Sequence, residues 1–87
     1  MGFALLFSKQ ALKDVEFHKK SGNKIILKKL QILLNELAEH PKTGTGKPEQ
    51  LKYELSGLWS RRINNEHRLI YEITENDVLI HSLKGHY

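Results

Sequence analysis

Apolar residues in the first part of the chain fall into a short run followed by a helical pattern. Residues 3–7 are apolar and too few for a helix, so they predict a strand that is buried on both faces. Ser8 is suited to cap a helix that follows it. The apolar face of this helix carries Ala11, Leu12 and Val15. Its opposite face carries Lys9, Lys13, Asp14 and Glu16. Because glycine readily adopts the left-handed conformation, the helix is expected to end near Gly22.

The next stretch has the strongest periodicity in the chain. Apolar residues recur there every three or four positions, at Ile26, Leu30, Leu33 and Leu37, which predicts a second helix. Asn23 can cap its start, and Pro41 stops it. Lysines lie near its start and glutamates near its end, which opposes the helix dipole, so tertiary packing must stabilise it. Since Gly22 leaves little room between the two helices, we expect an antiparallel helical hairpin.

The second half of the chain changes to a period of two. Residues 40–48 show neither period and contain two prolines and two glycines, so they predict a loop. Apolar and polar residues then alternate, with turn residues between, over three predicted strands: 58–63, 67–74 and 78–83. The pattern therefore predicts an α+β fold with the order β-α-α-β-β-β, a meander in the second half and the helical hairpin packed on one face.

Length and composition narrow the class of protein. With 87 residues the chain is expected to be one domain, 1–87, because a second would lack its own core. It has no cysteine, which excludes disulfides and thiolate catalysis. No apolar run approaches 18 residues and no basic segment precedes the first apolar run, so we expect neither a membrane span nor a signal peptide. A cytoplasmic location is the default expectation.

The charge balance is basic. Lys and Arg number 14 against 10 Asp and Glu, which gives a net charge of +4. This sign is typical of a nucleic-acid binder. Solubility alone also accounts for an excess of this size, so both interpretations stay open.

Several arginines lie in the predicted sheet. Arg61 and Arg62 are consecutive, so they point to opposite faces of their strand. Leu69 and Tyr71 are expected to face the helices, so Arg68 faces away from them. The arginines form either a solvated strand face or a cluster that grips phosphates.

Three other residues have both a structural and a chemical interpretation. His86 is a natural proton shuttle near neutral pH, or part of a frayed terminus. Glu49 is a loop carboxylate, which is normally a surface charge but can act as a base. Trp59 is expected in the core, and its alternative role is a stacking platform for a base.

Motifs for metals and nucleotides are absent from the sequence. The five histidines show no His-Glu-x-x-His spacing, and residues 44–47 lack the spacing of a Walker motif. We therefore expect no metal and no cofactor.

Four segments stand in a specific order along the chain. They read GKPEQLK at 46–52, LSGLWSRRI at 55–63, EHRLIY at 66–71 and HY at 86–87. In this combination the chain resembles the YoeB/Txe family of bacterial toxins, which belongs to the RelE/ParE superfamily. The resemblance implies a RelE-like fold, a small twisted and mostly antiparallel sheet with two helices against it. It also implies the toxin half of a toxin–antitoxin pair, which cleaves messenger RNA bound in the ribosomal A site.

The resemblance assigns roles to individual residues. Glu49 would be the general base, Arg68 would stabilise the transition state, and His86 would be the general acid. Tyr87 would be the terminal tyrosine that helps shape the site. Basic positions would contact RNA phosphates: Lys47, Lys52 and Arg62. Attack by the 2′-hydroxyl would leave a 2′,3′-cyclic phosphate and a 5′-hydroxyl.

The resemblance also implies partners. A cognate antitoxin of the YefM/Axe kind is expected to order a partly disordered acidic segment on the basic surface. It would inhibit by covering the arginine face or by displacing the terminal residues. The protein would contact a DNA operator only through the antitoxin, and dimers among relatives favour a homodimer.

Two other functions are compatible with the fold. Relatives of this fold inhibit gyrase rather than cut RNA, so a non-catalytic binding module is one alternative. A DNA co-repressor that acts together with its antitoxin is the other. The joint presence of Glu49, Arg68 and His86 favours the enzyme over both.

Overall fold

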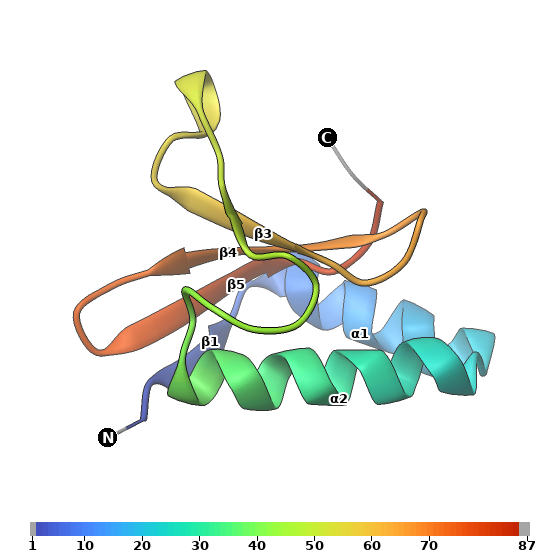
Figure 1. The fold of residues 1–87 in the computed structure, drawn as a ribbon. Coiled ribbons are helices and arrows are strands. Elements are labelled where there is room, and N and C mark those ends of the chain that lie inside the picture. Colours follow the sequence, from blue (N-terminus) through green and yellow to red (C-terminus); the bar gives the residue numbers. More distant parts are fainter. Residues whose placement is uncertain (1, 86–87) are drawn as a thin grey trace.

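One sheet and two helices make up the part of the chain that the computed structural model describes, residues 2–85 (Figure 1). The elements, in chain order, are β1 (Ala4–Phe7), α1 (Lys9–Ser21), α2 (Lys24–Glu39), β2 (Glu49–Gln50), the 3₁₀ turn η1 (Tyr53–Leu55), β3 (Leu58–Arg62), β4 (Arg68–Ile73) and β5 (Asp77–Ser82). The strands lie in the order β1-β5-β4-β3-β2. β1 pairs with β5 in parallel, and the other pairs are antiparallel. The predicted α+β fold is thus confirmed, with the two-residue strand β2 added.

Local capping signals place the helix ends where the sequence predicted them. The Ser8 hydroxyl accepts a hydrogen bond from the Ala11 amide at 3.0 Å, and α1 ends at Gly22 with φ 69°. The Asn23 side chain accepts from the amides of Ile25 and Ile26, each at 3.1 Å. α2 ends at Glu39, two residues before Pro41, whose ring cannot continue a helix.

Both helices cover the same face of the sheet (Figure 1). The periodic residues of α2 are all buried there: Ile26, Leu30, Leu33 and Leu37. The strands contribute the other side of this core, mainly through Leu69, Tyr71, Val78 and Ile80, and Leu83 just after β5 adds to it. Trp59 is half-buried and stacks on Tyr71, with ring centroids 6.4 Å apart, so its predicted core role is confirmed.

Three predictions about burial are wrong. β1 is not buried on both faces, because it lies at the edge of a sheet with helices on one side only, and Leu6 is 48% exposed. Leu12 points to solvent, although its spacing placed it on the apolar face of α1. Asp14 is only 3% exposed, although it was assigned to the outer face, because its carboxylate accepts the backbone amide of Leu83. In residues 2–85 no helix combines the length and apolar character needed to cross a membrane.

Candidate nucleic-acid site on the helix-free face

Strand register brings three predicted site residues to one face of the sheet. Glu49 in β2 lies opposite Ser60 in β3, and Arg62 in β3 lies opposite Arg68 in β4. Directly opposite residues share a face, and so do alternate residues within a strand such as Ser60 and Arg62. Glu49, Arg62 and Arg68 therefore lie on the same side of the sheet.

This side is the one that the helices leave uncovered. Arg61 and Leu69 alternate with the residues of the site, and both are fully buried on the helix side. Arg61 and Arg62 thus do point to opposite faces, as predicted. Of the residues that resemblance connected with RNA, Lys47, Glu49, Lys52 and Arg62 are exposed, and Arg68 is half-buried. The carboxylate of Glu49 and the guanidinium groups of Arg62 and Arg68 are accordingly available to a ligand on the helix-free face.

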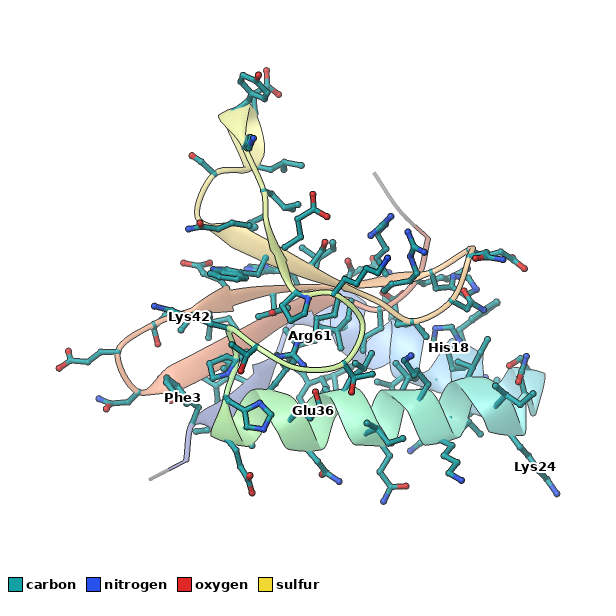
Figure 2. All side chains as sticks on the ribbon, in the orientation of Figure 1. Phe3, His18, Lys24, Glu36, Lys42 and Arg61 are labelled. Atoms are coloured by element: carbon teal, nitrogen blue, oxygen red, sulfur yellow. The ribbon has the colours of Figure 1, made fainter. Side chains whose placement is uncertain are left out.

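Arg61 ties the loop 40–48 to the sheet from the buried side (Figure 2). One guanidinium nitrogen, Nη2, donates to the carbonyl oxygens of His40 at 2.9 Å and Thr43 at 2.7 Å. The other, Nη1, forms an ion pair with Glu36 of α2 at 2.8 Å. The Tyr71 hydroxyl adds a hydrogen bond to the Pro41 carbonyl at 2.7 Å. The sequence analysis left this anchoring role of Arg61 unassigned.

The pKa values of two groups around Arg61, the Glu36 carboxyl and the Tyr71 hydroxyl, differ from their ordinary values. Burial tends to raise the pKa of the Glu36 carboxyl, but hydrogen bonds from Thr45 and the charge of Arg61 outweigh burial, so this pKa lies below its ordinary value of 4.5. Burial raises the pKa of the Tyr71 hydroxyl above 10.0, although Arg61 partly offsets the rise. Both groups therefore keep their usual charge states at neutral pH.

Gly46 brings the end of this loop into contact with β3. Its carbonyl accepts a hydrogen bond from the Arg62 amide at 2.7 Å, and its φ is 83°. A Cβ at this position would lie 2.8 Å from the Arg62 carbonyl oxygen, so only glycine fits. Lys47 follows with φ 52°, and the chain then enters β2 at Glu49. The close approach at Gly46 thus sets where Lys47 and Glu49 lie relative to Arg62.

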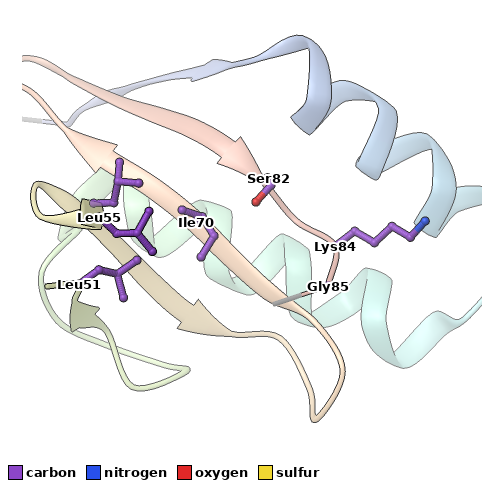
Figure 3. A pocket seen from close by; sticks show the side chains of 7 residues that line it. Leu51, Leu55, Ile70, Ser82, Lys84 and Gly85 are labelled. Atoms are coloured by element: carbon purple, nitrogen blue, oxygen red, sulfur yellow. The ribbon is translucent and has the colours of Figure 1, made fainter. Parts of the chain in front are cut away.

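An apolar pocket of about 350 Å³ opens on the same face (Figure 3). Its lining residues are Leu51, Leu55, Leu58, Ile70, Ser82, Lys84 and Gly85. The Lys84 side chain extends away from the leucines toward α1, where its Nζ lies 3.9 Å from the centroid of the Phe17 ring. The pocket therefore presents mainly hydrocarbon beside the charged residues of the site.

Gly85, the last described residue, is hydrogen-bonded to the start of β4. The Arg68 amide donates to the Gly85 carbonyl at 2.9 Å, and the Gly85 amide donates to Nδ1 of His67 at 2.9 Å. His86 and Tyr87, predicted as site residues, lie outside the described residues. Sequence analysis missed that Asp14 and His18 of α1 are hydrogen-bonded to the backbone of Leu83, and that His67 is hydrogen-bonded to the Gly85 amide. The only signal was the spacing of Asp14 and His18, which puts them four positions apart on one helix face.

Within residues 2–85 no three histidine, aspartate or glutamate side chains come together in a way that could hold a metal ion.

Two helices on one face of a five-stranded sheet, with Glu49, Arg62 and Arg68 on the other, form an architecture that bacterial toxins share. The solved structure of a YoeB/ParE toxin from Agrobacterium tumefaciens superposes with a TM-score of 0.89 at 30% identity, covering 98% of this chain and 100% of that chain. The model of the YoeB-like toxin of bacterial type II toxin–antitoxin systems matches residues 7–87, and the chain belongs to this family. The resemblance inferred from the sequence motifs is thus confirmed.

Individual relatives agree with this assignment. The Toxin YoeB of Synechocystis is 50% identical over 68 residues, which is 78% of this chain and 79% of the relative. Two structures from Staphylococcus aureus, a YoeB dimer and a YoeB–YefM complex, superpose with TM-scores of 0.85 and 0.84 at 41% and 42% identity. Each covers 98% of both chains. The protein is therefore a toxin of a type II toxin–antitoxin system.

Proposed function

We propose that this toxin is an endoribonuclease that cleaves messenger RNA in the ribosomal A site without a metal cofactor. The observation that carries the proposal is the register that places Glu49, Arg62 and Arg68 on one open face of the sheet. The chain end adds support, because Gly85 is hydrogen-bonded to the Arg68 backbone and His86 follows it directly.

Each proposed catalytic residue has one task. Glu49 accepts the proton of the 2′-hydroxyl, whose oxygen then attacks the adjacent phosphorus. Arg68 stabilises the charge of the pentacoordinate phosphorane. His86 protonates the departing 5′-oxygen, and Tyr87 shapes the site. The P–O5′ bond breaks as the new P–O2′ bond forms, which leaves a 2′,3′-cyclic phosphate and a 5′-hydroxyl.

The remaining basic residues hold the RNA rather than react with it. Lys47, Lys52 and Arg62 are exposed, and Arg62 lies on the helix-free face, so all three are free to contact phosphates. Glu49 is itself exposed to solvent. We therefore assign to the ribosome the task of holding the message in line for attack, since catalysis needs reacting atoms about 3–3.5 Å apart.

The S. aureus structures support two protein partners. One relative is a dimer and another is in complex with YefM. By analogy we propose a homodimer and a YefM-like antitoxin whose acidic segment covers the basic face. Binding to an operator would then occur only through the antitoxin, and action on ribosomes places the toxin in the cytoplasm.

A reconstituted cleavage assay tests the enzyme. Purified toxin is added to ribosomes that carry a labelled message and an empty A site, and the cut position and 3′-end chemistry are mapped. We expect A-site cleavage with a 2′,3′-cyclic phosphate, and no cleavage when the scissile nucleotide is 2′-deoxy. Glu49→Ala and His86→Ala should each lower the rate by about 10²–10⁴-fold, and Arg68→Ala by a similar or larger factor.

Two outcomes would contradict the proposal. An intact message with folded wild-type toxin would favour the binding module, and gyrase inhibition would then be assayed. A full cleavage rate in any one folded variant would remove that residue from the mechanism.

A further inference from the structure

The chain after β5 is held by side chains from elsewhere in the fold. The amide of Leu83 donates to Oδ2 of Asp14 at 2.9 Å, and Nε2 of His18 donates to the Leu83 carbonyl at 2.7 Å. Asp14 and His18 both come from α1 and are only 3% and 1% exposed. Both backbone polar groups of Leu83 are thus satisfied by buried partners.

Gly85 is held in the same way from the start of β4. Its amide donates to Nδ1 of His67, and its carbonyl accepts from the Arg68 amide, both at 2.9 Å. Lys84, between the two anchored residues, lies over the Phe17 ring at 3.9 Å. Residues 83–85, which we term the C-terminal segment, are therefore fixed at three consecutive positions.

Within residues 2–85, His67 is the side chain that anchors the last of these positions, Gly85. Because the Gly85 amide is a donor, Nδ1 of His67 must be the unprotonated nitrogen of the ring. The ring is also fixed in orientation, since it packs edge-on against His18 and Phe17 with centroids 5.0 and 6.3 Å away. Packing thus aims the Nδ1 lone pair at Gly85.

We infer that His67 is a positioning residue for the reaction, which holds Gly85 beside Arg68, one residue before the proposed general acid His86 in the sequence. The inference rests on the proposed function. Gly85 directly precedes His86 in the sequence, and consecutive Cα atoms are about 3.8 Å apart. An acid must reach the leaving oxygen within hydrogen-bond distance, and a misplacement of about 1 Å can lower the rate about 10²-fold.

Three substitutions separate the hydrogen bond from ring packing. His67→Phe keeps an aromatic ring against His18 but removes the acceptor, and His67→Ala removes both. His67→Asn removes the ring but supplies an amide oxygen that can accept from Gly85. We expect His67→Phe to lower kcat about 10- to 100-fold with KM unchanged, and His67→Asn to recover most of that rate. His81→Asn, at a histidine that pairs with Glu72 rather than with the C-terminal segment, serves as the matched control.

A message in which sulfur replaces the bridging 5′-oxygen tests whether His67 supports the protonation of the leaving group. Replacing the bridging 5′-oxygen by sulfur gives a leaving group that needs little protonation. His67→Phe and His86→Ala should therefore regain rate on this message, whereas Glu49→Ala should not. A purely structural role predicts equal losses on both messages, and that result would overturn the inference.

A measurement without RNA keeps this inference separate from the proposed function. Hydrogen exchange of the Gly85 amide, followed by NMR, should be about five- to tenfold faster in His67→Phe and near wild type in His67→Asn. Unchanged exchange in His67→Phe would overturn the anchoring itself. If anchoring is confirmed but wild-type toxin leaves the message intact, the proposed function fails and the role of His67 in catalysis fails with it.

Discussion

Arg61 is a fully buried cation, and each of the three nitrogens of its guanidinium group donates a hydrogen bond. Its Nε donates to the Tyr71 hydroxyl at 3.3 Å, and its two terminal nitrogens reach Glu36 and carbonyls of the loop 40–48. A buried charge is costly unless it is paired and hydrogen-bonded. Carbonyl groups of the loop therefore replace water around the Arg61 guanidinium. The same hydrogen bonds hold the loop against the sheet.

The ion pair should make stability depend on pH. The pKa of Glu36 is lower in the folded state than its ordinary value of 4.5, so its contribution is complete above about pH 4.5. That contribution is lost as pH falls through the lowered folded pKa. We expect the wild-type free energy of unfolding, measured by urea titration, to fall steeply with acidification below pH 4.5. Glu36→Gln should be less stable by about 3 kcal/mol at pH 7, because Arg61 loses its counter-charge.

The decisive comparison is between the pH dependence of the free energy of unfolding of Glu36→Gln and that of wild type. This variant should lose less stability than wild type over the same acidic range, since residue 36 no longer titrates. Parallel curves for the two proteins would mean that other carboxylates govern acid unfolding.

Sequence could predict that Arg61 and Arg62 point to opposite faces, because alternation is a local property of strands. It could not predict the partner of Arg61, since Glu36 is 25 positions away and enters contact only when α2 packs on the sheet. Asp14 was misplaced for the same reason, because its partner Leu83 is 69 positions distant.

At the level of elements, α2 shows how tertiary contacts override an unfavourable local pattern. No acidic residue lies in its first turn and no basic residue in its last, so its ends do not complement the helix dipole. Arg61 instead neutralises Glu36 near the C-terminal end. Thr45 donates to the same carboxylate through its amide at 2.7 Å and its hydroxyl at 2.6 Å. The helix caps were predictable because Ser8, Gly22 and Asn23 act on neighbouring residues. β2 was not, because its two residues carry no periodic signal.

Substitution of Gly46 tests whether its backbone contact with Arg62 of β3 positions the site. Gly46→Ala would place a Cβ 2.8 Å from the Arg62 carbonyl, so the loop must move away from the strand. Gly57→Ala is the matched control, because Gly57 also has positive φ, 95°, but no atom of residues 2–85 lies within 4 Å of the added Cβ. Both variants should lose about 1–2 kcal/mol of stability from backbone strain.

Only Gly46→Ala should also lower the cleavage rate on programmed ribosomes, because it displaces Lys47 and Glu49 from Arg62. Denaturant titration gives the stability of each variant, and the ribosome assay gives its activity. Equal activity of the two variants at matched stability would show that the Gly46 contact does not position the site.

At the level of the whole molecule, the two faces of the sheet have separate tasks. One face packs against both helices and forms the core, and the other carries Glu49, Arg62 and Arg68 beside an apolar pocket. The motif order was enough to predict the family, and the site residues that it implied remain a prediction. It did not predict the side chains that support the site, because Arg61 and His67 act through loop and segment backbones that only the folded chain brings near.

The separation of faces makes a prediction about salt dependence. Binding of single-stranded RNA weakens with salt, with a slope of log K against log salt of about −0.7 for each phosphate that is neutralised. The double variant Lys47→Gln/Lys52→Gln should therefore bind more weakly, and its slope should be shallower by about 1.4. Lys24→Gln/Lys28→Gln changes two exposed lysines of α2 and lowers the net charge by the same amount, from +4 to +2, yet its slope should equal that of wild type. Fluorescence anisotropy with an RNA that is 2′-deoxy at the scissile nucleotide measures binding without cleavage. Equal slopes in the two double variants would mean that RNA affinity depends only on net charge. That result would contradict the proposal that RNA binds at Lys47 and Lys52.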